Sequence, residues 1–210
     1  MFITFEGPEA SGKTTQVRLL AERLRQVGHE VVATHEPGGT RLGEQVRSIL
    51  LDRDGPSLTP LAEAMLFAAS RAQLVGEVID PALARGAVVV VDRFADSTRA
   101  YQGGGEGLSP SIVEALIAHA TGGLLPDLTV LLDIPAGKAM SGRLAGRNED
   151  RTRFEVRPES FHEQVRHAYL ALAKAEPGRW LVVNGMEPIT PIADRIWAEV
   201  ERRLGSSARR

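Results

Sequence analysis

The chain has 210 residues, of which 43% are hydrophobic and 25% are charged, and its formal net charge is −2. This composition excludes a disordered chain, and the absence of cysteine excludes a disulfide scaffold, a thiolate zinc site and a cysteine nucleophile. The slight negative charge argues against nucleic acid as a partner. The length suits a single domain over residues 1–210.

Short apolar runs alternate with longer helical patterns along the chain. We predict strands at residues 2–6, 30–34, 87–91, 128–133 and 180–184. We predict helices at residues 14–27, 42–51, 60 to beyond 71 with a bend before Pro81, 110–120, 136–144, 159–175 and 188–204. This alternation predicts an α/β fold in three layers, with helices on both faces of a five-stranded parallel sheet. Ligands of such sheets bind beyond the carboxyl ends of the strands.

No segment of the sequence is typical of a targeting signal or a membrane span. The first residues lack a basic segment, and Glu6 interrupts their apolar run. No stretch approaches 18 apolar residues, and the most apolar run, at 87–91, has the length of a strand. We therefore expect a cytoplasmic protein with no membrane partner.

The most informative motif follows the first predicted strand and opens a predicted helix. It reads Gly7-Pro8-Glu9-Ala10-Ser11-Gly12-Lys13-Thr14 and continues into Thr15. This spacing is typical of a phosphate-binding loop, in which backbone N–H groups and the helix N-terminus face an anion. Lys13, one of three lysines beside 22 arginines, is expected to reach the β and γ phosphates, and Thr14 to ligate Mg²⁺. A glycine-rich turn without a ligand is the alternative, which the complete spacing disfavours.

A second candidate site ends the third predicted strand. Asp92 directly follows the apolar run and is followed by Arg93. An acidic residue at this point resembles the partner of a phosphate loop that orients Mg²⁺, and Arg93 offers charge to a transferring phosphoryl group. The alternative is an ordinary ion pair at a strand end.

A polar stretch at about residues 142–157 is rich in arginine. It contains Arg143, Arg147, Arg151, Arg153 and Arg157. We interpret it as a mobile lid whose guanidinium groups close over the phosphates, since the phosphate loop contains no arginine. A solvated turn between helices is the alternative.

Phe67 and Arg71 lie four residues apart in a predicted helix, so they share one face. A ring beside a guanidinium group is able to hold a planar base by stacking and hydrogen bonds. The alternative is strong, because an aromatic residue in a helical apolar stripe usually belongs to the core.

Taken together, these segments resemble the thymidylate (dTMP) kinase family over nearly the whole chain. Besides the phosphate loop, the motifs are Glu36-Pro37-Gly38-Gly39-Thr40, Phe67 to Arg71, Asp92-Arg93-Phe94, Asp96-Ser97, Ala100-Tyr101-Gln102-Gly103, Asp133-Ile134-Pro135 and the arginine-rich lid. The resemblance implies a phosphate-loop NTPase-type fold and a homodimer. It also implies Mg²⁺-dependent transfer of the γ-phosphoryl group of ATP to dTMP, which serves dTTP synthesis.

The resemblance also implies a role for each matching residue. ATP is expected to contact Gly7, Pro8, Glu9, Ala10, Ser11, Gly12, Lys13, Thr14 and Thr15, with Arg143 beside adenine. The metal is expected at Thr14 and Asp92. The acceptor is expected to contact Glu9, Glu36, Pro37, Arg41, Phe67, Arg71, Arg93, Ser97, Tyr101 and Gln102. Within this set Glu9 would meet the sugar 3′-hydroxyl, Phe67 would stack on thymine, Arg71 would read its edge and Tyr101 would disfavour a ribose. Arg41 is the preferred contact for the acceptor phosphate, with Arg47 as the alternative.

The expected catalytic residues are Lys13, Asp92, Arg93 and one of Arg147, Arg151 and Arg153. Ala10 stands where some members of the family have an arginine, which resembles the bacterial type with its catalytic arginine in the lid. Phe94 replaces a frequent tyrosine and removes one hydroxyl group. The sequence does not choose among the three lid arginines.

Three other functions remain as alternatives. A phosphate-loop kinase could act on another nucleotide, a nucleoside or shikimate. A GTPase switch is disfavoured, since no Asn-Lys-x-Asp motif is present. A non-catalytic nucleotide-binding module is disfavoured because no catalytic element is missing. The five histidines show no metal-binding spacing.

Overall fold

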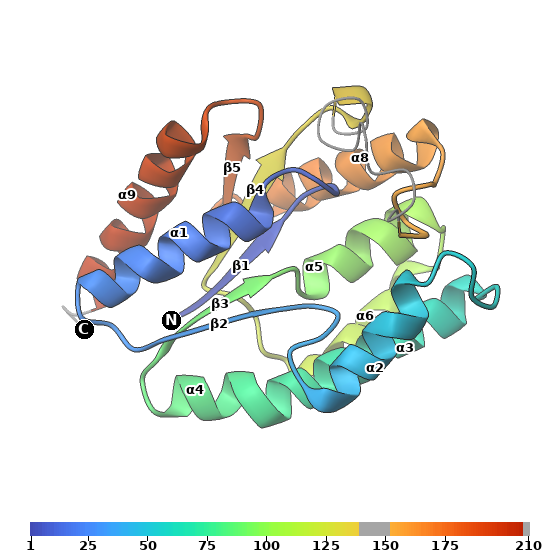
Figure 1. The fold of residues 1–210 in the computed structure, drawn as a ribbon, viewed down its shortest axis with the longest axis horizontal. Helices are drawn as coiled ribbons and strands as arrows, with labels where there is room; N and C mark the ends of the chain where they lie inside the picture. Colours follow the sequence, from blue (N-terminus) through green and yellow to red (C-terminus); the bar gives the residue numbers. More distant parts are fainter. Residues whose placement is uncertain (139–151, 208–210) are drawn as a thin grey trace.

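A five-stranded parallel sheet forms the centre of the described part of the chain (Figure 1). The computed structural model describes residues 1–138 and 152–207. Its strands are β1 (Phe2–Glu6), β2 (Val31–His35), β3 (Val88–Asp92), β4 (Leu128–Asp133) and β5 (Trp180–Asn184). They lie in the order β2-β3-β1-β4-β5, and every neighbouring pair is parallel. The predicted α/β fold of the P-loop NTPase type is confirmed.

Helices cover both faces of this sheet. They are α1 (Lys13–Gln26), α2 (Arg41–Leu51), α3 (Pro60–Leu74), α4 (Asp80–Ala84), α5 (Ala95–Thr98), α6 (Pro110–Thr121), α8 (Glu159–Ala175) and α9 (Ile189–Ser207). Two π-helical segments, η1 (Val75–Ile79) and η2 (Arg99–Gly105), continue α3 and α5. None of the described helices is long and apolar enough to span a membrane.

The alternation of side chains along β3 creates the two layers of the core. Val88 and Val90 face one side, where they pack with residues of α1 and α9. Val89 and Val91 face the other side, where they pack with residues of α3, η1 and α6. Successive strand residues point to opposite faces, so a continuous apolar run is the pattern of a strand that is buried on both sides.

Most predicted elements agree with the structure to within a few residues. Thr59 caps α3 by accepting from Ala62 N at 3.3 Å, with Pro60 in the first turn. Before Pro81, where a bend is expected, α3 continues through the π-helical segment η1 into α4. Residues 136–138 are helical, and the rest of the helix predicted at 136–144 lies outside the described residues. The sequence analysis missed the helical segment made by α5 and η2.

The strand register brings the chemically important loops together. Phe5 of β1 lies beside Asp92 of β3, and Glu6 lies beside Leu131 of β4. The phosphate loop that follows β1 therefore starts next to Asp92 and Arg93. His35, at the end of β2, is also in register with Asp92.

Candidate active site

The phosphate loop connects β1 to α1 and wraps around the Lys13 side chain. Lys13 Nζ donates to Gly7 O at 3.1 Å, Pro8 O at 2.6 Å and Ser11 Oγ at 3.3 Å. Burial, with the positive charge of Arg93 nearby, lowers the pKa of Lys13 to about 8. An ammonium group that is short of solvation gains strongly from a phosphate anion, which suits this residue to phosphate binding.

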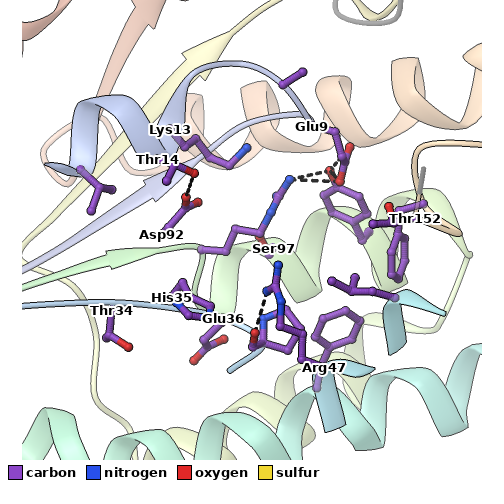
Figure 2. Close-up of a pocket in the computed structure, with 18 of the residues that line it drawn as sticks. Glu9, Lys13, Thr14, Thr34, His35, Glu36, Arg47, Asp92, Ser97 and Thr152 are labelled. Atoms are coloured by element: carbon purple, nitrogen blue, oxygen red, sulfur yellow. Dashed lines mark hydrogen bonds and ion pairs between the residues drawn. The ribbon is translucent and has the colours of Figure 1, made fainter. Parts of the chain in front are cut away.

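Two oxygen atoms that are able to bind a metal ion, one from Thr14 and one from Asp92, meet at the mouth of the loop. Thr14 Oγ1 donates to Asp92 Oδ2 at 2.7 Å (Figure 2). Mg²⁺ prefers oxygen ligands and is usually held by one or two protein groups together with phosphate oxygens and water. The pair fits that requirement, although no cluster of three or more metal-ligand side chains exists among the described residues. The loop also lines a cavity of about 630 Å³ together with Gln16, Glu187 and Ile189.

Arg93 lies where the loop meets a second, larger cavity. Its backbone is in the left-handed region, with φ 71°, which is uncommon for a residue other than glycine. Its Nη2 donates to Glu9 Oε1 at 3.1 Å and to the Tyr101 hydroxyl at 3.2 Å. Its Nη1 donates to Ser97 Oγ and the Tyr169 hydroxyl, each at 3.2 Å. Strained backbone held by several contacts is frequent at functional sites.

Glu9 is the acidic partner of Arg93 in the phosphate loop. The Tyr101 hydroxyl lies 2.7 and 2.8 Å from its two carboxylate oxygens. Burial opposes ionisation of Glu9, but Arg93 and Lys13 outweigh it and hold the pKa of the carboxyl below its ordinary value. The Glu9 carboxylate is therefore charged, and Arg93 and Tyr101 hold it in one orientation. These properties suit it to accept a hydrogen bond from a substrate hydroxyl.

A buried network behind Arg93 was missed by the sequence analysis. Glu6 accepts from Phe94 N at 2.9 Å, Ser97 Oγ at 2.6 Å and the Tyr169 hydroxyl at 2.8 Å. Burial and the nearby Asp96 carboxylate raise the pKa of Glu6 to about 7. The Tyr169 hydroxyl lies between Glu6 and Arg93, so α8 contributes to the position of the guanidinium group. The tertiary packing of α8 creates this contact, and no local motif indicates it.

The larger cavity has a volume of about 730 Å³ and collects most of the expected acceptor-binding residues. Those that line it are Glu9, Glu36, Pro37, Phe67, Arg93, Ser97, Tyr101 and Gln102, together with Lys13, Thr14 and Asp92. Figure 2 shows Lys13, Thr14 and Asp92 on one side of this cavity and Arg47 on the other. The rings of Phe67, Tyr101 and Phe154 form an apolar part of its wall and pack against one another, with centroids 5.9 Å apart for Phe67 and Phe154 and for Tyr101 and Phe154.

Arg71 lies behind the cavity wall. Its side chain is 1% exposed and donates from Nε to Glu36 Oε2 at 2.9 Å, from Nη1 to Thr98 Oγ1 at 2.9 Å and from Nη2 to Phe94 O at 3.1 Å. A guanidinium group has five N–H donors. One N–H of Nη1 has no partner among the described residues, and Thr98 beside it lines the cavity.

The two arginines that follow the Glu36–Thr40 segment differ in position. Arg47 lines the cavity, and its Nη1 donates to Pro37 O at 2.8 Å. Arg41 is exposed at the start of α2 and is not among the described residues that line the cavity. The geometry thus favours Arg47, the alternative in the sequence analysis, over Arg41.

The predicted lid is described only from residue 152 onward. Arg143, Arg147 and Arg151 lie outside the described residues. Arg153 Nη2 donates to Asp52 O at 2.7 Å and to Pro56 O at 3.1 Å, which fastens this segment to the α2–α3 connection. Its neighbours Thr152 and Phe154 line the cavity.

The parallel sheet, the phosphate loop and the adjoining cavity define a phosphate-loop kinase of small molecules. A family model described as thymidylate kinase matches residues 5–196. The thymidylate kinase of Deinococcus radiodurans is 49% identical, and that of Desulfosudis oleivorans is 47% identical. The first alignment covers 97% of both chains, and the second covers 96% of this chain and 97% of the relative. The crystal structure of thymidylate kinase from Ehrlichia chaffeensis is 36% identical, with a TM-score of 0.72 over 87% of this chain and 91% of that one. The chain belongs to the thymidylate kinase family and is therefore a phosphotransferase.

Proposed function

We propose that the chain transfers the γ-phosphoryl group of ATP to dTMP, giving dTDP and ADP, as a step of dTTP synthesis in the cytoplasm. The observation that carries this proposal is the position of Arg93. Its guanidinium group contacts Glu9 of the phosphate loop and also lines the acceptor cavity, so it adjoins both phosphate sites. A phosphoryl transfer between two polyanions needs positive charge at this point more than it needs a base.

On the donor side, we assign ATP to the phosphate loop, residues 7–15. Lys13 binds the β and γ phosphates, and Arg143 flanks adenine. The pair of Thr14 and Asp92 holds Mg²⁺, which when bound neutralises phosphate charge. Gln16, Glu187 and Ile189 support a base site beside the loop, because they line the smaller cavity together with Lys13.

On the acceptor side, thymine packs on Phe67 in the aromatic part of the cavity wall. Arg71 offers its remaining Nη1 hydrogen toward a base carbonyl, and Ser97 and Gln102 complete the base site. Glu9 accepts from the sugar 3′-hydroxyl, and Tyr101 closes the space that a ribose 2′-hydroxyl would need. Glu36 and Pro37 form the adjoining wall, where Arg47 binds the acceptor phosphate.

The lid supplies the last positive charge. We propose Arg147 or Arg151 for this role in preference to Arg153, because the guanidinium group of Arg153 is engaged by backbone carbonyl groups of the α2–α3 connection. Closure would exclude water and place charge where it develops in the transition state.

We also propose that the protein is a homodimer. Helices α2, α3 and α6 lie together in Figure 1, and they carry several large apolar side chains that are exposed to solvent. They are Leu42, Ile49, Leu61, Met65 and Ile112. An apolar surface of this kind is typical of a protein interface. Light scattering of the purified protein tests it, since a monomer at micromolar concentration would refute the dimer.

The activity is tested by incubation with ATP labelled at the γ-phosphate, Mg²⁺ and dTMP. The proposal requires the label to appear in dTDP. Replacement of Arg47 by Ala should raise the KM for dTMP about tenfold or more, because one charge-assisted hydrogen bond contributes about 1.5–3 kcal/mol. Arg41→Ala is the matched control and should change it less than about twofold, as an exposed surface residue. When another nucleotide or nucleoside replaces dTMP in the same assay, faster labelling of that acceptor would support the alternative kinase.

A further inference from the structure

Helix α3 carries a buried carboxylate that the proposed mechanism does not use. Glu63, Phe67 and Arg71 follow one another at intervals of four residues, so they lie on one face of the helix. The Glu63 side chain belongs to a residue that is only 2% exposed. It does not line the acceptor cavity, whereas Phe67 does.

The partner of Glu63 is a residue of the cavity wall. Gln102, on η2, is also 2% exposed, and its Nε2 donates to Glu63 Oε1 at 2.8 Å. An ionised carboxylate only accepts hydrogen bonds, so it pairs with the NH₂ end of an amide and repels the carbonyl end. Glu63 therefore determines which way round the Gln102 amide is held.

This orientation has a consequence for the ligand. The NH₂ end of the Gln102 amide is engaged by Glu63, which lies outside the cavity lining, whereas Gln102 itself lines the cavity, so the carbonyl end is the part of this amide left for a ligand. Gln102 Oε1 has no hydrogen-bond partner among the described residues. A carbonyl oxygen accepts from a ring N–H, such as N3–H of thymine, but it repels the unprotonated N3 of a cytosine ring. In a partly buried site this mismatch is costly, because the oxygen is left unpaired.

We propose that Glu63 is a positioning residue that gives the enzyme its preference for thymine over aminopyrimidine bases by fixing the orientation of the Gln102 amide. This inference rests on the proposed function. Glu63 does not touch the base and acts only through Gln102. Its carboxylate is a selectivity device rather than part of the phosphoryl-transfer machinery.

The test compares dTMP with 5-methyl-dCMP, which keeps the sugar, the phosphate and the 5-methyl group and changes only the hydrogen-bonding edge of the base. The variant Glu63→Gln places an amide opposite Gln102, so both orientations of Gln102 find a partner. We expect kcat/KM for dTMP to fall less than about fivefold and that for 5-methyl-dCMP to rise, so that their ratio drops at least about tenfold. Assays at pH 8 favour the ionised form of Glu63, whose pKa is raised by burial.

A purely structural role predicts another result. It would lower kcat/KM for both nucleotides by the same factor, and an unchanged ratio in the folded Glu63→Gln variant overturns the proposal. If that variant does not fold, Glu63→Met provides a second test, since an apolar side chain pairs with neither end of the amide and the ratio must again fall. Glu63→Asp keeps an acceptor-only group and should retain the preference for dTMP. Glu114→Gln, which neutralises an exposed carboxylate on α6, is the matched control and should leave the ratio unchanged.

The wild-type protein separates this inference from the proposed function. If it does not phosphorylate dTMP, the proposed function fails. If it phosphorylates dTMP with a strong preference over 5-methyl-dCMP, and every folded Glu63 variant keeps that preference, only the role of Glu63 fails.

Discussion

The Tyr169 hydroxyl is the contact through which α8 reaches Arg93 and Glu6. It donates to Glu6 Oε2 at 2.8 Å, lies 2.9 Å from Ser97 Oγ and accepts from Arg93 Nη1 at 3.2 Å. Replacement of Tyr169 by Phe removes this oxygen and keeps the buried ring. The perturbation is therefore confined to the hydrogen bonds.

The structure sets the size of the effect. Without the hydroxyl, Ser97 Oγ still bonds to Glu6 at 2.6 Å and to Arg93 at 3.2 Å, so neither group is left unpaired. We expect a loss of about 1–2 kcal/mol in the free energy of unfolding. In a chain of this length that lowers the Tm by roughly 2–8 °C. The Arg93 guanidinium group loses one of the four hydrogen-bond partners that it has among the described residues. A displacement of about 1 Å at a group that contacts the reacting atoms costs up to about 100-fold in rate.

Steady-state kinetics with ATP and dTMP distinguish positioning from mere stabilisation. We expect Tyr169→Phe to lower kcat about 10- to 100-fold with little change in either KM, at a temperature where the variant is fully folded. Thr121→Val is the control, because it removes a buried hydroxyl from α6 that accepts from Gly123 N at 3.2 Å, remote from the site. If both variants lose stability and neither loses kcat, Tyr169 does not position Arg93.

Three further predictions concern the loop and its surroundings. Lys13→Ala should lower kcat/KM at least about 100-fold with the fold retained, since it removes the positive charge assigned to the β and γ phosphates; near-normal turnover would refute this assignment. Gly7→Ala should destabilise the protein by about 1–3 kcal/mol in urea unfolding, because a Cβ would lie 2.6 Å from Leu132 O at a φ of +138°; wild-type stability would contradict this. Burial and Asp96 raise the pKa of Glu6 from 4.5 to about 7, so the folded state keeps a proton that the unfolded state releases. The free energy of unfolding of the wild type should therefore fall by about 3 kcal/mol more than that of Glu6→Gln as the pH rises through this range; parallel profiles would disprove it.

The sequence predicts those parts of the molecule that local patterns determine. The spacing of Gly7, Gly12, Lys13 and Thr14 indicates the loop, since each group acts within a few residues of the others. The apolar run before Asp92 indicates a buried strand, and the structure places it inside the sheet, between β2 and β1.

Tertiary packing creates the parts that the sequence did not reveal. Gly104 and Gly105 suggest a loop, but they belong to η2. A Cβ on Gly104 would lie 2.6 Å from Ala168 Cβ, and one on Gly105 would lie 2.5 Å from the Phe161 ring, so these glycines permit close packing of η2 on α8. The same packing brings the Tyr169 hydroxyl to Arg93, 76 residues away in the chain.

The measurement that tests the central claim most directly is a coupled assay of ADP release with ATP, Mg²⁺ and each nucleoside monophosphate in turn. The structure and the proposed acceptor site predict the highest kcat/KM for dTMP, with dUMP and dCMP well below it. A higher value for another acceptor, or ADP release that does not depend on any nucleotide acceptor, would contradict the account.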